Sequence, residues 1–200
     1  YNGLKLVKSG SRPLDPETDL LEVKYYAENL DVKIQFSQGI SQGIMEDISK
    51  VSRKAYVKKV TSLINVSSFC KMKVVVNSGN GAAGPTFDAI EKVLKANETM
   101  INFIKVFHKP DSSFPNGIPN PMLVENQKHT SEAVIRESAN LGIAFDGDFD
   151  RCFFFDEYGE FVQGEYIIGL LIEVFLEKQS DGTIVHDPRA LWNIQETIQA

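Results

Sequence analysis

The chain has 200 residues, of which 42% are hydrophobic and 24% are charged, and its formal net charge is −6. This composition is typical of a globular chain with one large domain, or one domain plus parts of others, and it argues against disorder. The acidic balance disfavours a general attraction to nucleic acid or to an anionic membrane, although a local cationic pocket for a phosphorylated small molecule is compatible with it.

Cysteine content and the length of hydrophobic runs indicate the cellular compartment. The sequence has two cysteines, Cys70 and Cys152, so we expect no disulfide framework and a reducing compartment. No apolar run in the sequence reaches the roughly 18 residues of a membrane span, and the first residues do not resemble a signal peptide. We therefore expect a cytoplasmic protein. Because the sequence opens on Tyr1 and stops inside a helical pattern, we also expect it to be part of a longer protein.

The first 43 residues are interpreted as the end of an earlier domain. Residues 1–17 combine a short strand with a turn, and residues 20–30 have helical character. Apolar residues at three- and four-residue spacing predict a helix over residues 47–64, which would lead into the central domain.

The central domain, residues 44–180, is predicted to be an α/β unit. The apolar run MKVVV is followed by the glycine-rich NSGNGAAG and then by an amphipathic pattern, and a second apolar run leads through a proline-rich loop to another helical pattern. This βαβα order favours a mixed, mainly parallel sheet with flanking helices. The expected strands cover residues 72–76, 101–107 and 142–145, and the expected helices cover residues 87–96 and 130–141.

The remaining elements follow the third strand. Residues 152–155 and 160–162 are predicted to form a hairpin, and residues 166–178 an apolar helix. A strand at residues 183–186 and a helix from Arg189 onward indicate that another α/β domain begins at residue 181.

The glycine loop allows two interpretations. Gly79, Gly81 and Gly84 match G-x-G-x-x-G between a strand and a helix, the context of a dinucleotide-binding loop. The acidic residue expected at the end of the next strand is absent, and Lys109 lies there instead, which leaves an NADP site as an alternative. The other interpretation is that the glycines let the helix pack closely on the sheet.

The segment DGDFDR concentrates three carboxylates, from Asp146, Asp148 and Asp150, beside Arg151. Two unit charges about 4 Å apart repel by roughly 4 kcal/mol at an effective dielectric constant near 20, so a cation is expected among them. Carboxylate ligands without cysteine or clustered histidine favour a hard ion such as Mg²⁺. An EF-hand loop is excluded because Arg151 stands where that loop needs glycine. A guanidinium beside the metal would suit a phosphate contact.

Residues 142–171, GIAFDGDFDRCFFFDEYGEFVQGEYIIGLL, resemble the metal-binding loop and following helix of the α-D-phosphohexomutase family. The resemblance extends through YNGLKLV, VVVNSGNGAAGPT, PDSSFPNGIPNP and TIVHDPRALWN, and it is greatest to bacterial members that act on mannose phosphates. Family members are similar in having four domains around a cleft, with a phosphoserine in the first and the Mg²⁺ loop in the second. The chain would then hold the end of domain 1, domain 2 and the start of domain 3.

The resemblance implies a role for each matching residue. Asp146, Asp148 and Asp150 would be the Mg²⁺ ligands, while Arg151 and Lys5 would act on the transferring phosphoryl group. The partners would be hexose phosphates of mannose or glucose, and the phosphoserine would lie before Tyr1, outside this sequence. A non-catalytic α/β ligand-binding module is the alternative from another class of function.

The sequence does not decide the role of one further cluster of polar residues. His186, Asp187 and Arg189 follow the expected strand at residues 183–186, where either a substrate site or local hydrogen bonding is compatible with them.

Overall fold

The strand β3 (Met72–Asn77) is central to the sheet because three consecutive valines give it two apolar faces. In the computed structural model, which describes residues 6–29, 44–179, 181–187 and 191–199, Val74 and Val76 pack into one hydrophobic cluster and Val75 into another. All three side chains are buried. A strand that is buried on both faces requires a helical layer on each side of the sheet.

The sheet has five strands in the order β4-β3-β5-β6-β7. The strands β4 (Ile101–Val106), β3 and β5 (Leu141–Phe145) are parallel, whereas β6 (Cys152–Phe155) and β7 (Phe161–Val162) run antiparallel at one edge. The predicted mixed, mainly parallel sheet is confirmed. Because β3, β4 and β5 are parallel neighbours, the loops that follow them all emerge at the same edge of the sheet.

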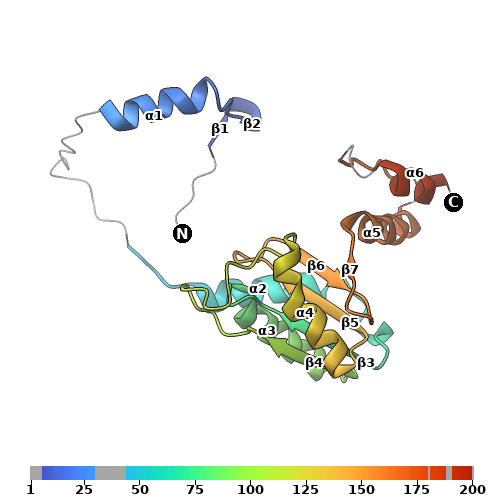
Figure 1. The fold of residues 1–200 in the computed structure, drawn as a ribbon. Helices are drawn as coiled ribbons and strands as arrows, with labels where there is room; N and C mark the ends of the chain where they lie inside the picture. The colour runs from blue at the N-terminus through green and yellow to red at the C-terminus, as the bar shows by residue number, and fades with distance from the viewer. Residues whose placement is uncertain (1–5, 30–43, 180, 188–190, 200) are drawn as a thin grey trace. The chain divides into compact units, whose positions relative to one another are not determined.

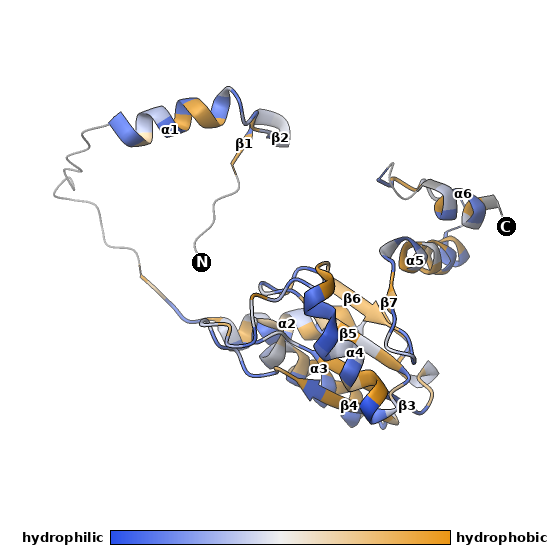
Figure 2. Ribbon diagram, in the orientation of Figure 1, coloured by the Kyte–Doolittle hydropathy of each residue, from blue (hydrophilic) through white to orange (hydrophobic). Residues whose placement is uncertain are grey.

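Helices cover both faces of this sheet (Figure 1). The helix α4 (Val124–Glu137) places Ala133 and Val134 against Val75, and α3 (Ala83–Ala96) places Phe87 against Val74 and its neighbours on the opposite face. The helix α2 (Ser49–Thr61) packs on α3. The strands β6 and β7 are coloured as hydrophobic in Figure 2.

The described chain divides into two compact units, residues 1–46 and 47–200. The first contains the antiparallel pair β1 (Val7–Lys8) and β2 (Arg12–Pro13), joined by a 3₁₀ turn, and the helix α1 (Asp19–Asn29). Lys8 forms an ion pair of 2.5 Å with Asp19. The domain boundaries expected at residues 43/44 and 180/181 stay predictions.

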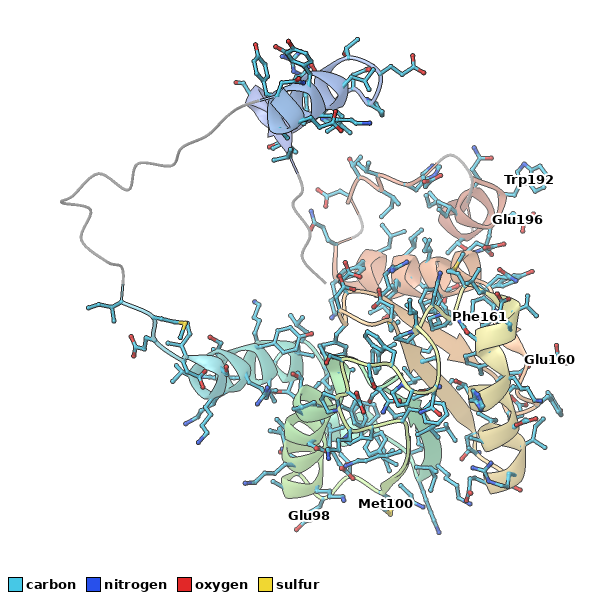
Figure 3. The ribbon with its side chains drawn as sticks, turned by 60° about the vertical axis from the view of Figure 1, so that its left-hand side comes forward. Glu98, Met100, Glu160, Phe161, Trp192 and Glu196 are labelled. Atoms are coloured by element: carbon cyan, nitrogen blue, oxygen red, sulfur yellow. The ribbon has the colours of Figure 1, made fainter. Side chains whose placement is uncertain are left out.

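The second unit continues beyond the sheet with α5 (Gly164–Lys178) and α6 (Leu191–Gln199), which pack on each other. The Asn193 amide donates a 2.6 Å hydrogen bond to the Glu165 carbonyl oxygen, and Trp192 projects from α6 into solvent (Figure 3). Within the described ranges, no helix combines the length and the apolarity that crossing a bilayer requires.

Two element predictions are wrong. Residues 183–186 form no strand, because no neighbouring strand pairs with them in the described part of the chain. The helix predicted from residue 130 begins at Val124 and ends at Glu137. It ends earlier than predicted because Ser138 takes a left-handed backbone conformation, with φ of 51°, which helices commonly adopt at their C-terminus.

Candidate metal centre

The acidic loop, residues 146–151, follows β5 directly and turns the chain back into β6. Its ends are tied by two hydrogen bonds: the Asp146 amide donates to the Arg151 carbonyl oxygen at 3.3 Å, and the Arg151 amide donates to Asp146 Oδ1 at 3.0 Å. The Phe149 amide donates to the Asp146 carbonyl oxygen at 3.3 Å. The loop is therefore a closed turn whose first residue, Asp146, is hydrogen-bonded to its last residue, Arg151.

Three carboxylates converge in this turn. Oxygens of Asp146, Asp148 and Asp150 all lie within 4.8 Å of one another. Asp146 is 1% exposed, whereas Asp148 and Asp150 are exposed. The donor set consists of carboxylate oxygens alone, with open space on the side of the two exposed members. These features fit a hard divalent cation that keeps coordination positions for water or a substrate oxygen.

Arg151 balances the charge of the buried carboxylate. Its Nη2 and Nε atoms lie 2.7 and 2.8 Å from Asp146 Oδ2, and its Nε lies 3.3 Å from Asp150 Oδ1. Burial would raise the pKa of Asp146, but hydrogen bonds from the Arg151 amide, the Asp148 carboxyl and the guanidinium outweigh burial and hold that pKa below its ordinary value. Asp146 is thus kept ionised beside a fixed cation.

Asp148 has the opposite shift. Its hydrogen bond to Asp146, its partial desolvation and the nearby negative charges of Asp146 and Asp150 raise its pKa above the ordinary value. Arg151 contacts Asp146 and Asp150, and no ion pair links it to Asp148. Asp148 is accordingly the member of the set that still needs a positive partner, which a bound cation would provide.

Three loops meet at the carboxyl ends of β3, β4 and β5. The glycine loop, residues 77–84, supports the acidic loop because the Ala82 amide donates a 3.0 Å hydrogen bond to the Gly147 carbonyl oxygen. The proline loop, residues 108–121, is tied to the glycine loop by hydrogen bonds of 2.8 Å between Asn116 and Asn80 side chains and between the Asp111 amide and the Asn80 carbonyl oxygen. The chain passes from β3 to β4 on one side and then to β5 on the other side of β3, so the strand order reverses between β3 and β5. Open α/β sheets place ligand sites at such a switch point.

The dinucleotide interpretation of the glycine loop fails. A pyrophosphate needs free main-chain amides, yet the four amides of residues 79–82 already donate to Asn77 Oδ1 and to the carbonyl oxygens of Phe107, Ser78 and Gly147. A Cβ atom at Gly81 would lie 2.6 Å from the Gly147 oxygen, and one at Gly84 would collide with the His108 carbonyl oxygen. The glycines serve close packing, as the other interpretation expected, and one of them packs against the acidic loop itself.

Residues 54–159, which include all three loops, match the family described as phosphoglucomutase/phosphomannomutase, alpha/beta/alpha domain II. The chain belongs to this family. The family resemblance drawn from DGDFDR is therefore confirmed, and the candidate metal centre lies inside the matched region of the phosphoglucomutase/phosphomannomutase family.

Individual relatives agree with this assignment. A phosphomannomutase of Salmonella montevideo is 49% identical over 200 residues, which are 100% of this chain and 43% of that protein, and one of Escherichia coli K12 is 48% identical with the same coverage. The crystal structure of a phosphoglucomutase/phosphomannomutase family protein from Burkholderia thailandensis superposes with a TM-score of 0.63 at 26% identity, over 74% of this chain and 31% of that chain. The chain thus spans less than half the length of these curated relatives.

The other residues predicted to have a functional role are Lys5 and the cluster of His186, Asp187 and Arg189. Lys5 and Arg189 lie outside the described residues. His186 makes a contact of 3.0 Å between its Nδ1 and the carbonyl oxygen of the next residue, Asp187.

Two aromatic residues at the centre were missed by the sequence analysis. Phe149 lies within the acidic loop with its ring centroid 6.5 Å from that of Tyr56 on α2. Tyr56 carries no local signal for such a role, because it lies on a helix far from the loop in the sequence. For Phe149, the sequence offered one signal of a structural role, which is a bulky aromatic residue inside a tight acidic turn.

Proposed function

We propose that this chain is the metal-binding part of a Mg²⁺-dependent phosphohexomutase. One observation supports the proposal above all: three carboxylates converge beside Arg151 at the end of β5 in a chain of the phosphoglucomutase/phosphomannomutase family. The whole enzyme would interconvert hexose 6-phosphate and hexose 1-phosphate through a phosphoserine and a bisphosphate intermediate. The serine would be supplied by a part of the longer protein outside these 200 residues.

Each residue of the centre has a distinct task in this proposal. Asp146, Asp148 and Asp150 hold Mg²⁺, which when bound neutralises charge on phosphoryl oxygens. Arg151 orients the transferring phosphoryl group with its paired N–H donors, and its 56% exposed side chain is within reach of a substrate in solvent. Lys5 contributes a second positive charge near the same group. Alignment and charge balance are the main demands of phosphoryl transfer.

The proposed substrates are hexose monophosphates. Mannose phosphates are favoured over glucose phosphates because the relatives at 48 and 49% identity are named phosphomannomutases. The net charge of −6 gives no reason to add nucleic acid or an anionic membrane as a partner. A cytoplasmic location stays a prediction from the cysteine content.

Metal titration of the chain tests the proposal. Asp148→Asn removes the carboxylate that lacks an arginine partner, so it should lower the affinity for Mg²⁺, or for Mn²⁺ used as a spectroscopic probe, by at least about tenfold. Affinity is measured by isothermal titration calorimetry or by the loss of the free Mn²⁺ resonance signal.

Glu157→Gln is the matched control. Glu157 is an exposed carboxylate in the β6–β7 turn, six residues beyond the acidic loop, and it is the residue that would bind the ion in an EF-hand. Its loss should leave the affinity unchanged. Equal metal affinity in the parent and the Asp148→Asn variant would contradict the proposal. In the longer protein, Asp148→Asn should abolish mutase turnover of mannose 1-phosphate.

A further inference from the structure

Phe149 has an unusual backbone conformation for its residue type. It lies between Asp148 and Asp150 with φ of 66°, in the left-handed region. That region is costly for a bulky side chain and is normally occupied by glycine, asparagine or aspartate. The loop has its glycine at position 147 instead, so the local sequence does not favour a left-handed turn at Phe149. Contacts elsewhere must stabilise it.

The Phe149 ring lies between two other aromatic rings. Its centroid is 4.8 Å from that of Phe145 at an interplanar angle of 76°, and 6.5 Å from that of Tyr56 at 63°. Edge-to-face pairs at such separations are favourable beyond simple burial. Phe145 is the last residue of β5 and Tyr56 lies on α2. The ring therefore connects the acidic loop both to the last residue of β5 and to a residue of α2.

The left-handed residue is also where the loop reverses. The Phe149 amide donates to the Asp146 carbonyl oxygen, and the next residue, Asp150, returns to within 3.3 Å of the Arg151 Nε that contacts Asp146. The convergence of three carboxylates within 4.8 Å depends on this reversal. A residue at position 149 that relaxed to the ordinary right-handed or extended region would direct Asp150 away from Asp146.

We propose that Phe149 and Tyr56 are positioning residues for the metal centre. Neither supplies a ligand atom; the Phe149 ring, held by Tyr56, fixes the turn that brings the ligands together and thereby sets the affinity for the divalent cation. The inference rests on the proposed function, because the ion is the one that the mutase would use.

Mn²⁺ titration of single variants provides the first test. Phe149→Gly removes the ring and permits many backbone conformations, so it should weaken Mn²⁺ binding by about tenfold, as loss of supporting contacts around a metal site typically does. Phe149→Tyr keeps the ring and should bind as the parent does. Tyr56→Ala should weaken binding by about threefold, the effect of one lost aromatic contact. Tyr158→Ala, at a 71% exposed tyrosine, is the control and should have no effect.

A double variant tests whether Tyr56 acts through Phe149. In the Phe149→Gly background, Tyr56→Ala should cause no further loss of affinity, because the contact that it removes is already gone. An additional loss of the same size in both backgrounds would overturn the link. Because Tyr56 is 48% exposed, Tyr56→Ala should leave the fold intact. If Phe149→Gly does not fold, the Mn²⁺ affinity of Tyr56→Ala alone decides whether the aromatic contact positions the metal ligands.

Hydrogen exchange of the metal-free chain separates this inference from the proposed function. The Arg151 amide, which bonds to Asp146 Oδ1, should lose protection in Phe149→Gly and in Tyr56→Ala and keep it in Phe149→Tyr. Unchanged protection and unchanged Mn²⁺ affinity in both loss variants would overturn the positioning role. A parent chain that binds no Mn²⁺ would contradict the proposed function, while the exchange result would still decide the role of Phe149.

Discussion

The main-chain amide of Ala82 and the carbonyl oxygen of Gly147 are joined by a hydrogen bond of 3.0 Å. Through this contact the loop with three aspartates rests on the loop that precedes α3. The N-terminal end of a helix carries partial positive charge, which suits an acidic neighbour. The glycine loop thus supports the loop that carries the three aspartates.

Gly81→Ala should disturb this support. The added methyl group would lie 2.6 Å from the Gly147 oxygen and 2.9 Å from its Cα atom, both of which belong to the main chain and cannot simply rotate away. We expect the free energy of unfolding to fall by about 1–3 kcal/mol, the usual cost of overpacking. Urea unfolding followed by circular dichroism measures the loss.

Gly164→Ala is the control for Gly81→Ala. Gly164 begins α5, and a Cβ atom there meets no heavy atom within 4 Å. Equal stabilities of the two variants would show that Gly81 and Gly147 do not approach each other as closely as described.

Asn77→Ala should cost comparable stability for a different reason. Asn77 Nδ2 donates to Thr130 Oγ1 at 2.9 Å and its Oδ1 accepts from the Gly79 amide at 2.9 Å, so one buried side chain joins β3, α4 and the glycine loop. The alanine leaves the Gly79 amide without its acceptor, and we expect a loss of about 2 kcal/mol in the free energy of unfolding. Asn97→Ala, at an exposed amide near the end of α3, should cost far less in the same urea titration.

The sequence predicted those parts of the fold whose signals are local. The valine run of β3, the amphipathic spacing of α3 and the turn residues between β6 and β7 each specify their own element. The acidic loop was placed correctly because the apolar runs on both sides of its alternating aspartates form neighbouring strands. The strand expected at residues 183–186 failed because strand formation requires a partner, which periodicity does not reveal.

The supporting residues of the metal centre could not be predicted in this way. Tyr56 and Ala82 contact the acidic loop across long separations in sequence, and nothing in their own segments indicates it. Phe149 goes against local preference, since its backbone is left-handed, and its ring contacts rings that belong to other elements. Such positions, where tertiary contacts override propensity, concentrate at functional sites.

Acid should weaken the folded state through a charge network between α3 and β4. Lys105 Nζ lies 2.5 Å from Asp88 and 2.6 Å from Glu91. Burial would raise the pKa of both carboxyls, but hydrogen bonds from Lys105, with His108 on Asp88 and Lys95 on Glu91, lower these pKa values below the ordinary 3.8 and 4.5. As the pH falls, these two carboxylates therefore take up protons in the unfolded chain before they do so in the folded chain. The stability that the charge network contributes is complete above about pH 5 and is lost as the pH falls through 4 and below.

Lys105→Met isolates that contribution. At pH 7 we expect a loss of about 1 kcal/mol, since Asp88 is 53% exposed and water screens its share. The difference in the free energy of unfolding between parent and variant should shrink as the pH is lowered below 4. Lys92→Met, at an exposed lysine on α3, should show no such dependence. A parent–variant difference that stays constant from pH 7 to pH 3 would contradict the assignment.

Arg151→Met should reveal how strongly the acidic loop depends on its internal cation. Asp146 is 1% exposed, and the variant leaves its carboxylate with the main-chain amide of residue 151 and the neighbouring Asp148 carboxyl. Removing one partner of a buried ion pair is expensive, but the guanidinium is 56% exposed, so we expect a loss of about 2 kcal/mol in metal-free buffer. Arg136→Met, at a 62% exposed arginine beside Glu137, should cost much less.

A second substitution separates loss of charge balance from loss of packing. Asp146→Asn combined with Arg151→Met removes the unpaired negative charge, so the double variant should be more stable than Arg151→Met alone in the same urea titration. If the stability loss came instead from the missing contacts of the arginine side chain, Asp146→Asn would add its own cost and the double variant would be the least stable of the three. That ordering would show that Arg151 acts on this loop by packing, and its assignment as the counterion of Asp146 would have to be abandoned.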